Sequence, residues 1–428
     1  MKVVHLWKSD SSFRGGGGAI SMHRLHSGLR TAGIDSKILC KIKTTQSPNV
    51  EVLQKGSLAR VTDKLLEQFT SRLGLNDVHQ LSSFQIKQNP TFANADLVHF
   101  HGIHGGFINY LALPALTADK PAVFTLKDMW MLTGHCGYAF DCDRWQTGCG
   151  NCPYLETPPE VTRDATALEW KLKDWIYDRL NLTLVCPSKW IADLAAQSPL
   201  TNRFPIHHIP HGINTEVFHP LNVEQCRLEL NLPLDKKVLM FASVQLSDER
   251  KGGDLLIKAL QNLPPSLKAE TVLLVFGKDA KALASTVGIA TYDLGYINED
   301  RAKVVAYSAA DLFLFPTRAD VFGLVSLESQ ACGTPVISFN VGGVPDHVRP
   351  KITGYLAPPE DAKDFSKGIV ELLEDDALRQ QMSQQCRAIA EREYSLPLYA
   401  QRHINLYEQL LATQNSNLKT QEMILGQA

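Results

Sequence analysis

Two carboxylates separated by a short helical stretch are the residues whose chemistry is easiest to interpret. Asp320 stands just before a helix predicted over 322–333, and Glu328 lies inside that helix. Eight helical residues span about 12 Å, which is about the separation between the two ends of a nucleotide-sugar. We expect one carboxylate to bind hydroxyls of a sugar and the other to bind those of a ribose, while amides at the helix start hold the diphosphate. A capping aspartate and a solvent-facing glutamate would give the same pattern.

A basic pair follows the apolar run 238–242. Arg250 and Lys251 come after the carboxyl end of this predicted strand, where ligands bind in doubly wound sheets. A departing diphosphate gains negative charge, which arginine and lysine stabilise. A charged surface turn is the alternative interpretation of such a pair.

Four consecutive glycines, 15–18, separate the first predicted strand from the first predicted helix. Glycine lets backbone amides approach a phosphate or a sugar closely. The same turn fits a dinucleotide-binding oxidoreductase, which would need an acidic residue at the end of the second strand. That strand ends in Cys40 and Lys41, so this alternative lacks its ribose ligand.

Histidines and a lysine follow two further predicted strands. His99, His101 and His104 lie at the end of the run 97–100, and we expect His101 and His104 to bind acceptor hydroxyls and His99 to be structural. Lys127 ends the run 122–126 and should reach a ligand cleft. It could bind a phosphate-bearing or acidic acceptor, assist the departing diphosphate, or be a surface lysine without a role.

Four cysteines cluster within a segment that has no strand pattern: Cys136, Cys142, Cys149 and Cys152, with His135 adjacent. The last two form a Cys-x-x-Cys pair, which is typical of structural zinc sites. The cluster predicts one structural zinc ion, with disulfides or free thiols as the alternatives. The five remaining cysteines lie in apolar contexts and are expected to be reduced core residues.

Near-continuous apolar runs alternate with helical patterns along the chain, which predicts doubly wound α/β sheets. The predicted strands are 3–7, 37–40, 97–100, 122–126, 182–186, 238–242, 272–276, 312–315 and 336–339, and the clearest helical patterns are 20–32, 253–263, 377–392 and 398–411.

A stretch rich in proline, glycine and asparagine, 209–214, interrupts this alternation near the middle of the chain and reads as a linker. The sequence thus predicts an N-terminal domain over 1–207 and a C-terminal domain over 208–393. A final helix over 394–412 follows, and we expect the polar tail 413–428 to be disordered.

Composition excludes several classes of function. The net charge is −2, which gives no basic footprint for nucleic acid. No apolar run reaches the roughly 20 residues of a spanning helix, and the first residues form a strand pattern rather than a signal peptide. We expect a cytoplasmic protein, with peripheral contact at the inner face of the membrane as a further expectation.

Together these motifs resemble the retaining glycosyltransferases of family 4. The similarity covers most of the chain in order and rests on Gly15–Gly18, His99-x-His101, Pro187–Trp190, Ile209–Asn214, Arg250–Gly252 and the block Asp320–Pro335. The segment from Lys127 through Pro153 is similar to a subgroup that assembles surface polysaccharides.

The resemblance implies an α/β fold of the GT-B architecture, with two Rossmann-like domains facing across a cleft and the final helix crossing back onto the first. It implies that Glu328 binds the ribose and Asp320 the donor sugar. It also implies that the amides of Gly323 and Leu324 hold the diphosphate, and that the catalytic step needs no metal cofactor.

The remaining implied contacts concern both substrates. Arg250 and Lys251 would stabilise the leaving diphosphate, and Gly17 and Gly18 would approach the donor or the acceptor. The implied substrates are a UDP- or GDP-linked sugar and a glycan or lipid-linked acceptor. A non-catalytic sugar-nucleotide-binding protein on the same fold is a further alternative.

Three positions depart from the family pattern. The first acid is Asp320 where the family usually has glutamate, one methylene longer. Gln245 stands where an arginine is usual, so Arg250 would cover that role. Lys127 stands where a histidine is usual, which affects how the acceptor and the departing group are handled.

Overall fold

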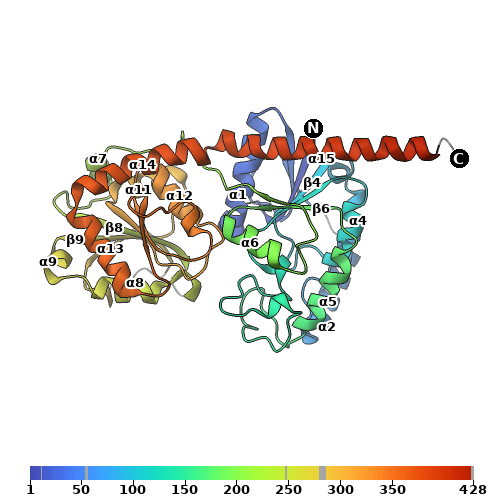
Figure 1. The fold of residues 1–428 in the computed structure, drawn as a ribbon, viewed down its shortest axis with the longest axis horizontal. Helices are drawn as coiled ribbons and strands as arrows, with labels where there is room; N and C mark the ends of the chain where they lie inside the picture. The colour runs from blue at the N-terminus through green and yellow to red at the C-terminus, as the bar shows by residue number, and fades with distance from the viewer. Residues whose placement is uncertain (11, 54–55, 246–247, 279–285, 426–428) are drawn as a thin grey trace. The chain divides into compact units, whose positions relative to one another are not determined.

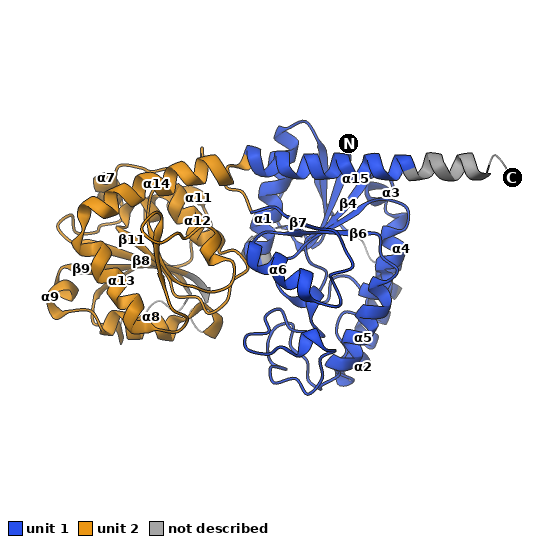
Figure 2. Ribbon diagram, viewed as in Figure 1, with its two compact units in different colours: residues 1–210, 397–428 blue, residues 211–396 orange. Residues whose placement is uncertain are grey.

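A computed structural model describes residues 1–10, 12–53, 56–245, 248–278 and 286–425 (Figure 1). The chain divides into two compact units (Figure 2). Unit 1 comprises Met1–Pro210 and Pro397–Ala428, and unit 2 comprises His211–Leu396. The boundaries predicted at 207/208 and 393/394 lie a few residues before these. Each unit is described below by itself.

Unit 1 is built on a seven-stranded parallel sheet. Its strands, in spatial order, are β3 (Val50–Val52), β2 (Asp35–Ile42), β1 (Lys2–Ser9), β4 (Leu97–Phe100), β5 (Ala122–Thr125), β6 (Leu182–Cys186) and β7 (Ile206–His208). The strand order reverses between β1 and β4, and ligands of doubly wound sheets bind beside such a reversal.

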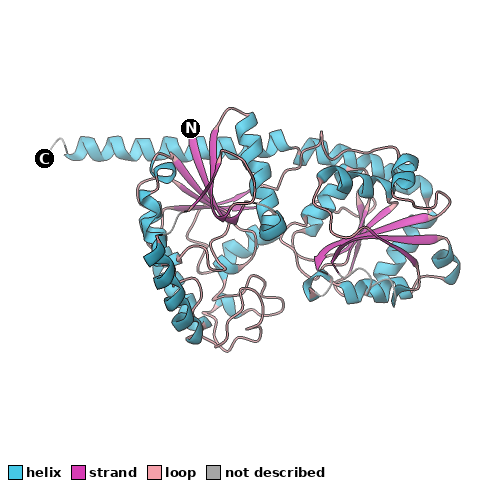
Figure 3. Ribbon diagram, turned by 180° about the vertical axis from the view of Figure 1, so that it is seen from behind, coloured by secondary structure: helices cyan, strands magenta, loops and turns pink. Residues whose placement is uncertain are grey.

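Helices and short turns connect these strands and cover the sheet on both faces (Figure 3). They are α1 (Ser12–Thr31), α2 (Ser57–Arg72), η1 (Leu81–Gln88), α3 (Pro90–Ala93), η2 (Tyr110–Ala112), α4 (Leu113–Thr117), η3 (Trp130–Leu132), η4 (Arg144–Gln146), α5 (Thr166–Tyr177), α6 (Lys189–Gln197) and α15 (Leu396–Leu425). Helix α1 breaks at Gly16, whose φ of 57° and ψ of −154° are not helical.

The last helix returns to unit 1, and it is longer than predicted. Tyr407 of α15 is fully buried and bonds to His99 of β4, which anchors the helix on the sheet of unit 1. The structure continues this helix to Leu425, whereas a disordered tail was predicted from Thr413. The polarity of the tail suggested disorder, yet it contains no glycine or proline before Gly426 that would end a helix.

Unit 2 is built on a six-stranded parallel sheet. Its strands, in spatial order, are β10 (Ala290–Asp293), β9 (Thr271–Lys278), β8 (Lys237–Gln245), β11 (Leu312–Phe315), β12 (Val336–Phe339) and β13 (Gly354–Ala357). The connecting helices and turns are α7 (Val223–Glu229), η5 (Glu249–Lys251), α8 (Gly253–Gln261), α9 (Pro265–Ala269), α11 (Asp300–Ala309), α12 (Leu324–Ala331), η6 (Val344–Asp346), α13 (Ala362–Glu374) and α14 (Asp376–Tyr394).

The packing of β8 shows why its central residues, 238–242, are apolar without interruption. Val238 and Met240 pack into a core shared with α7, α11 and α12, whereas Leu239 and Phe241 pack into a second core with α8 and α13. Successive side chains of a strand point to opposite faces. Because both faces are buried, every position from Val238 to Ala242 is apolar.

Candidate functional site

The loops that follow β8 and β11 are joined in unit 2. The amide of Arg318 donates to the carbonyl of Arg250 at 2.8 Å. Gly252 has a φ of 69°, and a Cβ at this position would lie 1.8 Å from the carbonyl oxygen of Pro316. Glycine at 252 therefore lets the basic turn pack directly against the loop that carries Asp320.

Asp320 is the centre of a compact charged cluster. One carboxylate oxygen is 2.9 Å from Nζ of Lys251 and 3.5 Å from Nη1 of Arg250. The other accepts the amide of Gly323 at 2.9 Å and that of Phe322 at 3.3 Å. The carboxylate thus occupies the start of α12, where free amides attract an anion.

Electrostatics keep this cluster charged. Burial alone would raise the pKa of Asp320, but the charges of Lys251 and Arg250 outweigh it and hold the pKa well below its ordinary value. Burial lowers the pKa of Lys251, and the charge of Asp320 opposes that change. The carboxylate is therefore ionised at neutral pH, and two cations face it.

A pair of glycines fixes the backbone of Asp320. The amide of Gly343 donates to the Asp320 carbonyl at 3.0 Å. Gly342 has a φ of 53°, and a Cβ there would lie 2.2 Å from the same carbonyl oxygen. This close approach requires glycine, and the turn after β12 thereby fixes the position of the Asp320 backbone.

Helix α12 places the second acid deep in unit 2. Gly323 caps the helix with a φ of 84°, and Leu324 begins it. Glu328 is only 2% exposed and accepts the hydroxyl of Tyr307 at 3.4 Å. The sequence alternative of a solvent-facing glutamate is therefore wrong, because the side chain is buried.

A buried histidine next to this helix was not singled out by the sequence. Nε2 of His347 lies 2.6 Å from the Ser326 hydroxyl, and its ring stacks on Phe322 with centroids 4.8 Å apart. Burial lowers the pKa of His347 to about 4, so the ring is neutral. The glycine pair directly before η6 was the only signal in the sequence that pointed to this segment.

In unit 1, His101 does not lie at the surface. Its side chain is 1% exposed, and Nε2 faces Nδ1 of His5 at 2.9 Å. Burial lowers the pKa of both rings, so they are neutral. In this structure the side chain of His101 is buried and faces His5, so its direct contact with acceptor hydroxyls stays a prediction.

His99 is structural, as its position suggested. Its Nδ1 bonds to the Tyr407 hydroxyl at 2.6 Å and its Nε2 to the Thr125 hydroxyl at 2.7 Å. Among the described residues, His5, His99 and His101 form a group whose potential ligand atoms lie within 4.8 Å of one another. Both nitrogens of His99 are engaged, so this trio is a hydrogen-bonded core cluster.

His104 forms an ion pair with the residue after Lys127. Its Nε2 lies 2.8 Å from Oδ2 of Asp128, and the two side chains are 23% and 22% exposed. Burial acts to lower the pKa of His104, but the Asp128 carboxylate outweighs it and raises the pKa above its ordinary value. Both residues follow adjacent strands, β4 and β5, which is why residues distant in sequence meet.

Lys127 turns back onto the glycine loop. Its Nζ donates to the Gly18 carbonyl at 2.6 Å and also bonds to the Ser21 hydroxyl, and it lies 5.2 Å from the Trp7 ring centroid. A Cβ on Gly18 would approach the Trp7 ring to 2.5 Å, while Gly17 is exposed. The lysine is neither a free cation nor an idle surface residue, because it positions this loop.

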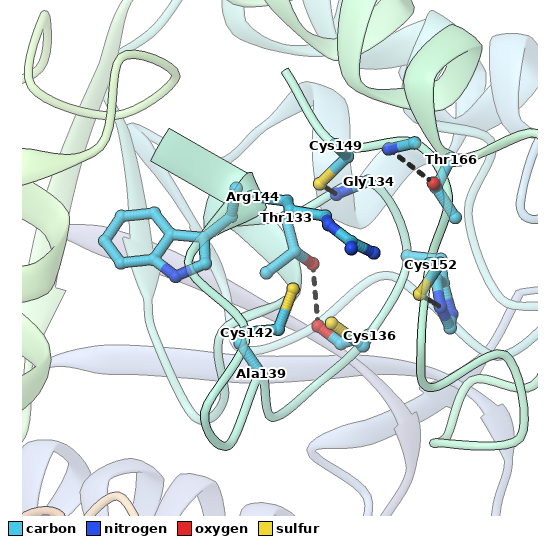
Figure 4. Close-up of a pocket in the computed structure, with 12 residues that line it drawn as sticks. Thr133, Gly134, Cys136, Ala139, Cys142, Arg144, Cys149, Cys152 and Thr166 are labelled. Carbon is cyan, nitrogen blue, oxygen red and sulfur yellow. Dashed lines mark hydrogen bonds between the residues drawn. The ribbon is translucent and has the colours of Figure 1, made fainter. Parts of the chain in front are cut away.

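The four clustered cysteines line one small cavity in unit 1 (Figure 4). The cavity has a volume of about 20 Å³, and His135, Arg144 and Thr166 also line it. All four cysteines are free thiols in this structure. The sequence grouped these residues, and the fold brings them together.

A larger cavity of about 370 Å³ lies in unit 1 at the carboxyl ends of β1 and β2. Lys8, Lys41, His79 and Asp77 line it, together with Gly105 and Gly106. Nζ of Lys41 donates to the Gly106 carbonyl at 2.7 Å. The sequence did not predict this cavity, because its residues come from separate loops.

Family models match both halves of the chain. Residues 15–217 match the model described as Glycosyltransferase Family 4, and residues 225–388 match the model described as Glycosyl transferases group 1. The D-inositol 3-phosphate glycosyltransferase of Mycobacteroides abscessus is 34% identical over 278 residues, which cover 61% of this chain and 61% of that protein. The same enzyme of Xylanimonas cellulosilytica is 32% identical over 204 residues, 44% and 47% of the two chains. The matches therefore span about half to three fifths of these relatives.

Solved structures resemble the chain over almost its whole length. Sucrose-phosphate synthase of Thermosynechococcus elongatus has a TM-score of 0.68 at 21% identity, covering 96% of this chain and 100% of that one. The glycosyltransferase WaaG has a TM-score of 0.65 at 19% identity, covering 95% and 99%. HepE of Anabaena, solved with UDP and glucose, has a TM-score of 0.64 at 17% identity, covering 96% and 100%. At these identities the similarity establishes the fold.

No helix within the described residues combines the length and the apolar character that crossing a bilayer requires. The two sheets, their strand orders and the family matches agree with one another. The chain therefore has the GT-B fold of glycosyltransferases, and its two parts are similar to the Family 4 and the group 1 glycosyltransferase models in that order.

Proposed function

We propose that this chain is a retaining glycosyltransferase that takes its sugar from a UDP- or GDP-linked donor bound by unit 2. The observation that carries the proposal is the cluster of Asp320, Lys251, Arg250 and the Gly323 amide at the start of α12. Cations and a helix start directed at one point form an anion site. The UDP found with HepE supports a nucleotide diphosphate as that anion.

Donor binding then proceeds by exchange of one anion for another. The diphosphate takes the place of the Asp320 carboxylate beside Lys251 and the Gly323 amide. The released carboxylate turns to the hydroxyls of the donor sugar. Glu328, eight residues along the same segment, accepts the ribose hydroxyls, so a single loop and helix bind both ends of the donor.

Transfer with retention needs no separate protein base. The bond from the sugar C1 to the phosphate oxygen breaks, a bond from C1 to the acceptor oxygen forms on the same face, and the acceptor proton passes to the leaving phosphate. Lys251 and Arg250 stabilise the charge that accumulates on that phosphate. Because they supply the positive charge, we expect transfer to proceed without a catalytic divalent metal.

The acceptor is proposed to carry phosphate and to bind unit 1. The curated relatives carry the name D-inositol 3-phosphate glycosyltransferase, which includes a phosphate-bearing compound. Lys127 was the predicted acceptor cation, but its ammonium group is held by the glycine loop. Lys8, which lines the larger cavity of unit 1, is the cation that we propose instead. A lipid-linked sugar phosphate of cytoplasmic surface-polysaccharide synthesis has this chemistry.

The direct experiment incubates the full chain with UDP- and GDP-sugars and measures release of the nucleoside diphosphate, with and without phosphate-bearing acceptors. We expect release from one donor class, acceleration by an acceptor, and a product with the donor's anomeric configuration by NMR. A brief excess of chelator should leave the rate unchanged. Binding without turnover would identify a sugar-nucleotide-binding protein, and a response to NAD instead would identify an oxidoreductase.

Lys251→Ala should abolish turnover, with Lys237→Ala as the matched control. Lys237 lies in the same unit and forms an ion pair with Asp376. The control removes the same charge, so a general effect of charge on unit 2 would appear in both variants. Turnover that survives Lys251→Ala in a folded protein would contradict the assigned site.

A further inference from the structure

The segment between η3 and α5 has little regular structure of its own. Within Thr133–Ala165, all of which the structure describes, the only helical element is the short turn η4. Loops of this length inside compact domains are uncommon unless something orders them. Trp145 and Ala139 are nevertheless buried, at 4% and 2% exposed, so the segment has a defined interior.

That interior is the cysteine cavity. In Figure 4 the side chains of Cys136, Cys142, Cys149 and Cys152 come from four points of the loop and line one cavity, together with Arg144. The cavity volume of about 20 Å³ is room for one water-sized sphere. An ion of similar size would fit into this space, and the four sulfurs would have to move toward it in order to bind it.

Hydrogen bonds already support these sulfurs as they do in metal sites. The amide of Gly134 donates to Sγ of Cys149 at 3.2 Å. His135 places Nε2 at 3.4 Å from Sγ of Cys152, while its Nδ1 lies 3.1 Å from the Pro159 carbonyl. Such surrounding partners orient metal ligands and tune their charge.

The backbone around the Cys-x-x-Cys pair is left-handed at four successive residues. The φ angles are 126° at Gly148, 56° at Cys149, 98° at Gly150 and 47° at Asn151. Asparagine tolerates such an angle, but a cysteine adopts it only where the surroundings fix it. A ligand that binds both Cys149 and Cys152 would do so.

A buried positive charge lies beside the cluster. Lys173 of α5 is fully buried, and its ammonium donates to the carbonyls of Trp130 and Thr133 at 2.7 and 2.9 Å. Four thiolates around a divalent cation carry two net negative charges. The ammonium group of Lys173 offsets part of that charge inside the unit.

We propose that the thiolates of Cys136, Cys142, Cys149 and Cys152 bind one zinc ion in tetrahedral geometry. Each thiol gives its proton to water as its bond to zinc forms. No three of the sulfurs lie within 4.8 Å of one another in this structure. Binding must therefore draw them together to about 3.8 Å, the separation that zinc–sulfur bonds of about 2.3 Å require.

The ion would support the unit 1 site through Gly137, the neighbour of Cys136. The Met129 amide donates to the Gly137 carbonyl at 2.7 Å, and a Cβ on Gly137 would lie 3.5 Å from Cβ of Asp128. Asp128 in turn holds His104. The four cysteines are therefore positioning residues for this ion pair, and none of them contacts the donor.

The test measures metal directly in the full chain, purified without chelator. Elemental analysis should give about one zinc per chain, and a mercurial that blocks thiols should release it. Replacement by cobalt should give the intense visible absorption of a tetrahedral thiolate site. Little or no zinc, or four titratable thiols without metal release, would overturn the proposal. Two disulfides in the native protein would do the same.

Variants identify the ligands. Cys149→Ser and Cys136→Ser should lower the zinc content several-fold, whereas Cys226→Ser, which alters a buried cysteine of unit 2, should leave it unchanged. If the ligand variants fail to fold, the cobalt spectrum of the wild-type chain still decides the proposal. Zinc content in Cys149→Ser equal to that of the wild type would contradict it.

Discussion

Replacing Asp320 with asparagine separates two roles of its carboxylate, which are to occupy the phosphate site before the donor binds and to bind the donor sugar afterwards. In the structure the carboxylate occupies the site that we assign to the donor phosphate, bonded to Lys251 and to the Gly323 amide. A phosphate must displace it in order to bind. Asparagine has the same shape without the charge, so displacement should become easier.

The size of the effect follows from the bonds that the carboxylate makes. A hydrogen bond that involves a charged group contributes about 1.5–3 kcal/mol, against about 0.5–1.5 kcal/mol for a neutral pair. The difference of roughly 1–1.5 kcal/mol corresponds to about five- to tenfold in affinity. We therefore expect Asp320→Asn to bind UDP five- to tenfold more tightly than the wild type, while sugar transfer falls because the sugar hydroxyls lose their acceptor.

Calorimetric titration with UDP measures the first effect, and turnover of the UDP-sugar measures the second. The pKa of Asp320 lies well below its ordinary value, so the gain in affinity should be constant across the neutral range. Asp376→Asn controls for a general change in charge. Weaker UDP binding by a folded Asp320→Asn variant would refute the displacement argument, because it would mean that the carboxylate supports the phosphate site.

Three further variants test separate parts of the structure. Glu328→Gln should weaken UDP binding by about 1–3 kcal/mol through loss of the ribose contact, with an unchanged melting temperature; equal affinity by calorimetry would exclude that contact. Gly252→Ala should destabilise unit 2 by more than about 1–2 kcal/mol in urea unfolding, because the alanine would have a left-handed backbone and its Cβ would clash with the Pro316 carbonyl. Gly295→Ala should destabilise the unit less, because Gly295 has a φ of 66° but no atom within 4 Å of the added Cβ. His104→Gln should remove the stability that the ion pair with Asp128 contributes. That contribution is fully present below pH 6.5, the ordinary pKa of histidine, and declines as pH rises through the raised pKa of His104. A stability difference from the wild type that grows with pH in urea titrations would contradict the pairing.

The interior strands could be predicted from the sequence, and the edge strands could not. The runs 97–100, 182–186, 312–315 and 336–339 coincide with β4, β6, β11 and β12. These strands have neighbours on both sides and helices on both faces, so their side chains are buried and mostly apolar.

The four strands without a prediction, β3, β7, β10 and β13, are the four edges of the two sheets. None of them is buried along its whole length, and they are only three or four residues long. A short, half-exposed strand leaves no continuous apolar run, so its position depends on the partner strand rather than on its own residues.

The unit 2 site could be predicted in outline because β8 and β11 are neighbours. Lys251 and Asp320, 69 residues apart, meet since each follows a strand whose carboxyl end lies at the same edge of the sheet. The pairing of Asp320 with the helix start was not predicted, because it depends on the rotamer of one side chain. The bond from Lys127 to the glycine loop was not predicted for a similar reason, because a lysine side chain is long enough to turn back onto a neighbouring loop.

Hydrogen exchange measured by mass spectrometry, with and without the nucleotide-sugar donor, tests the donor site most directly. With the donor bound, we predict slower exchange in the peptides that contain Lys251 and the segment from Asp320 to Glu328. The nucleoside diphosphate alone should protect the Gly323 amide to the same extent. Protection confined to the glycine loop of unit 1, or produced by NAD and by no nucleotide-sugar, would contradict this prediction.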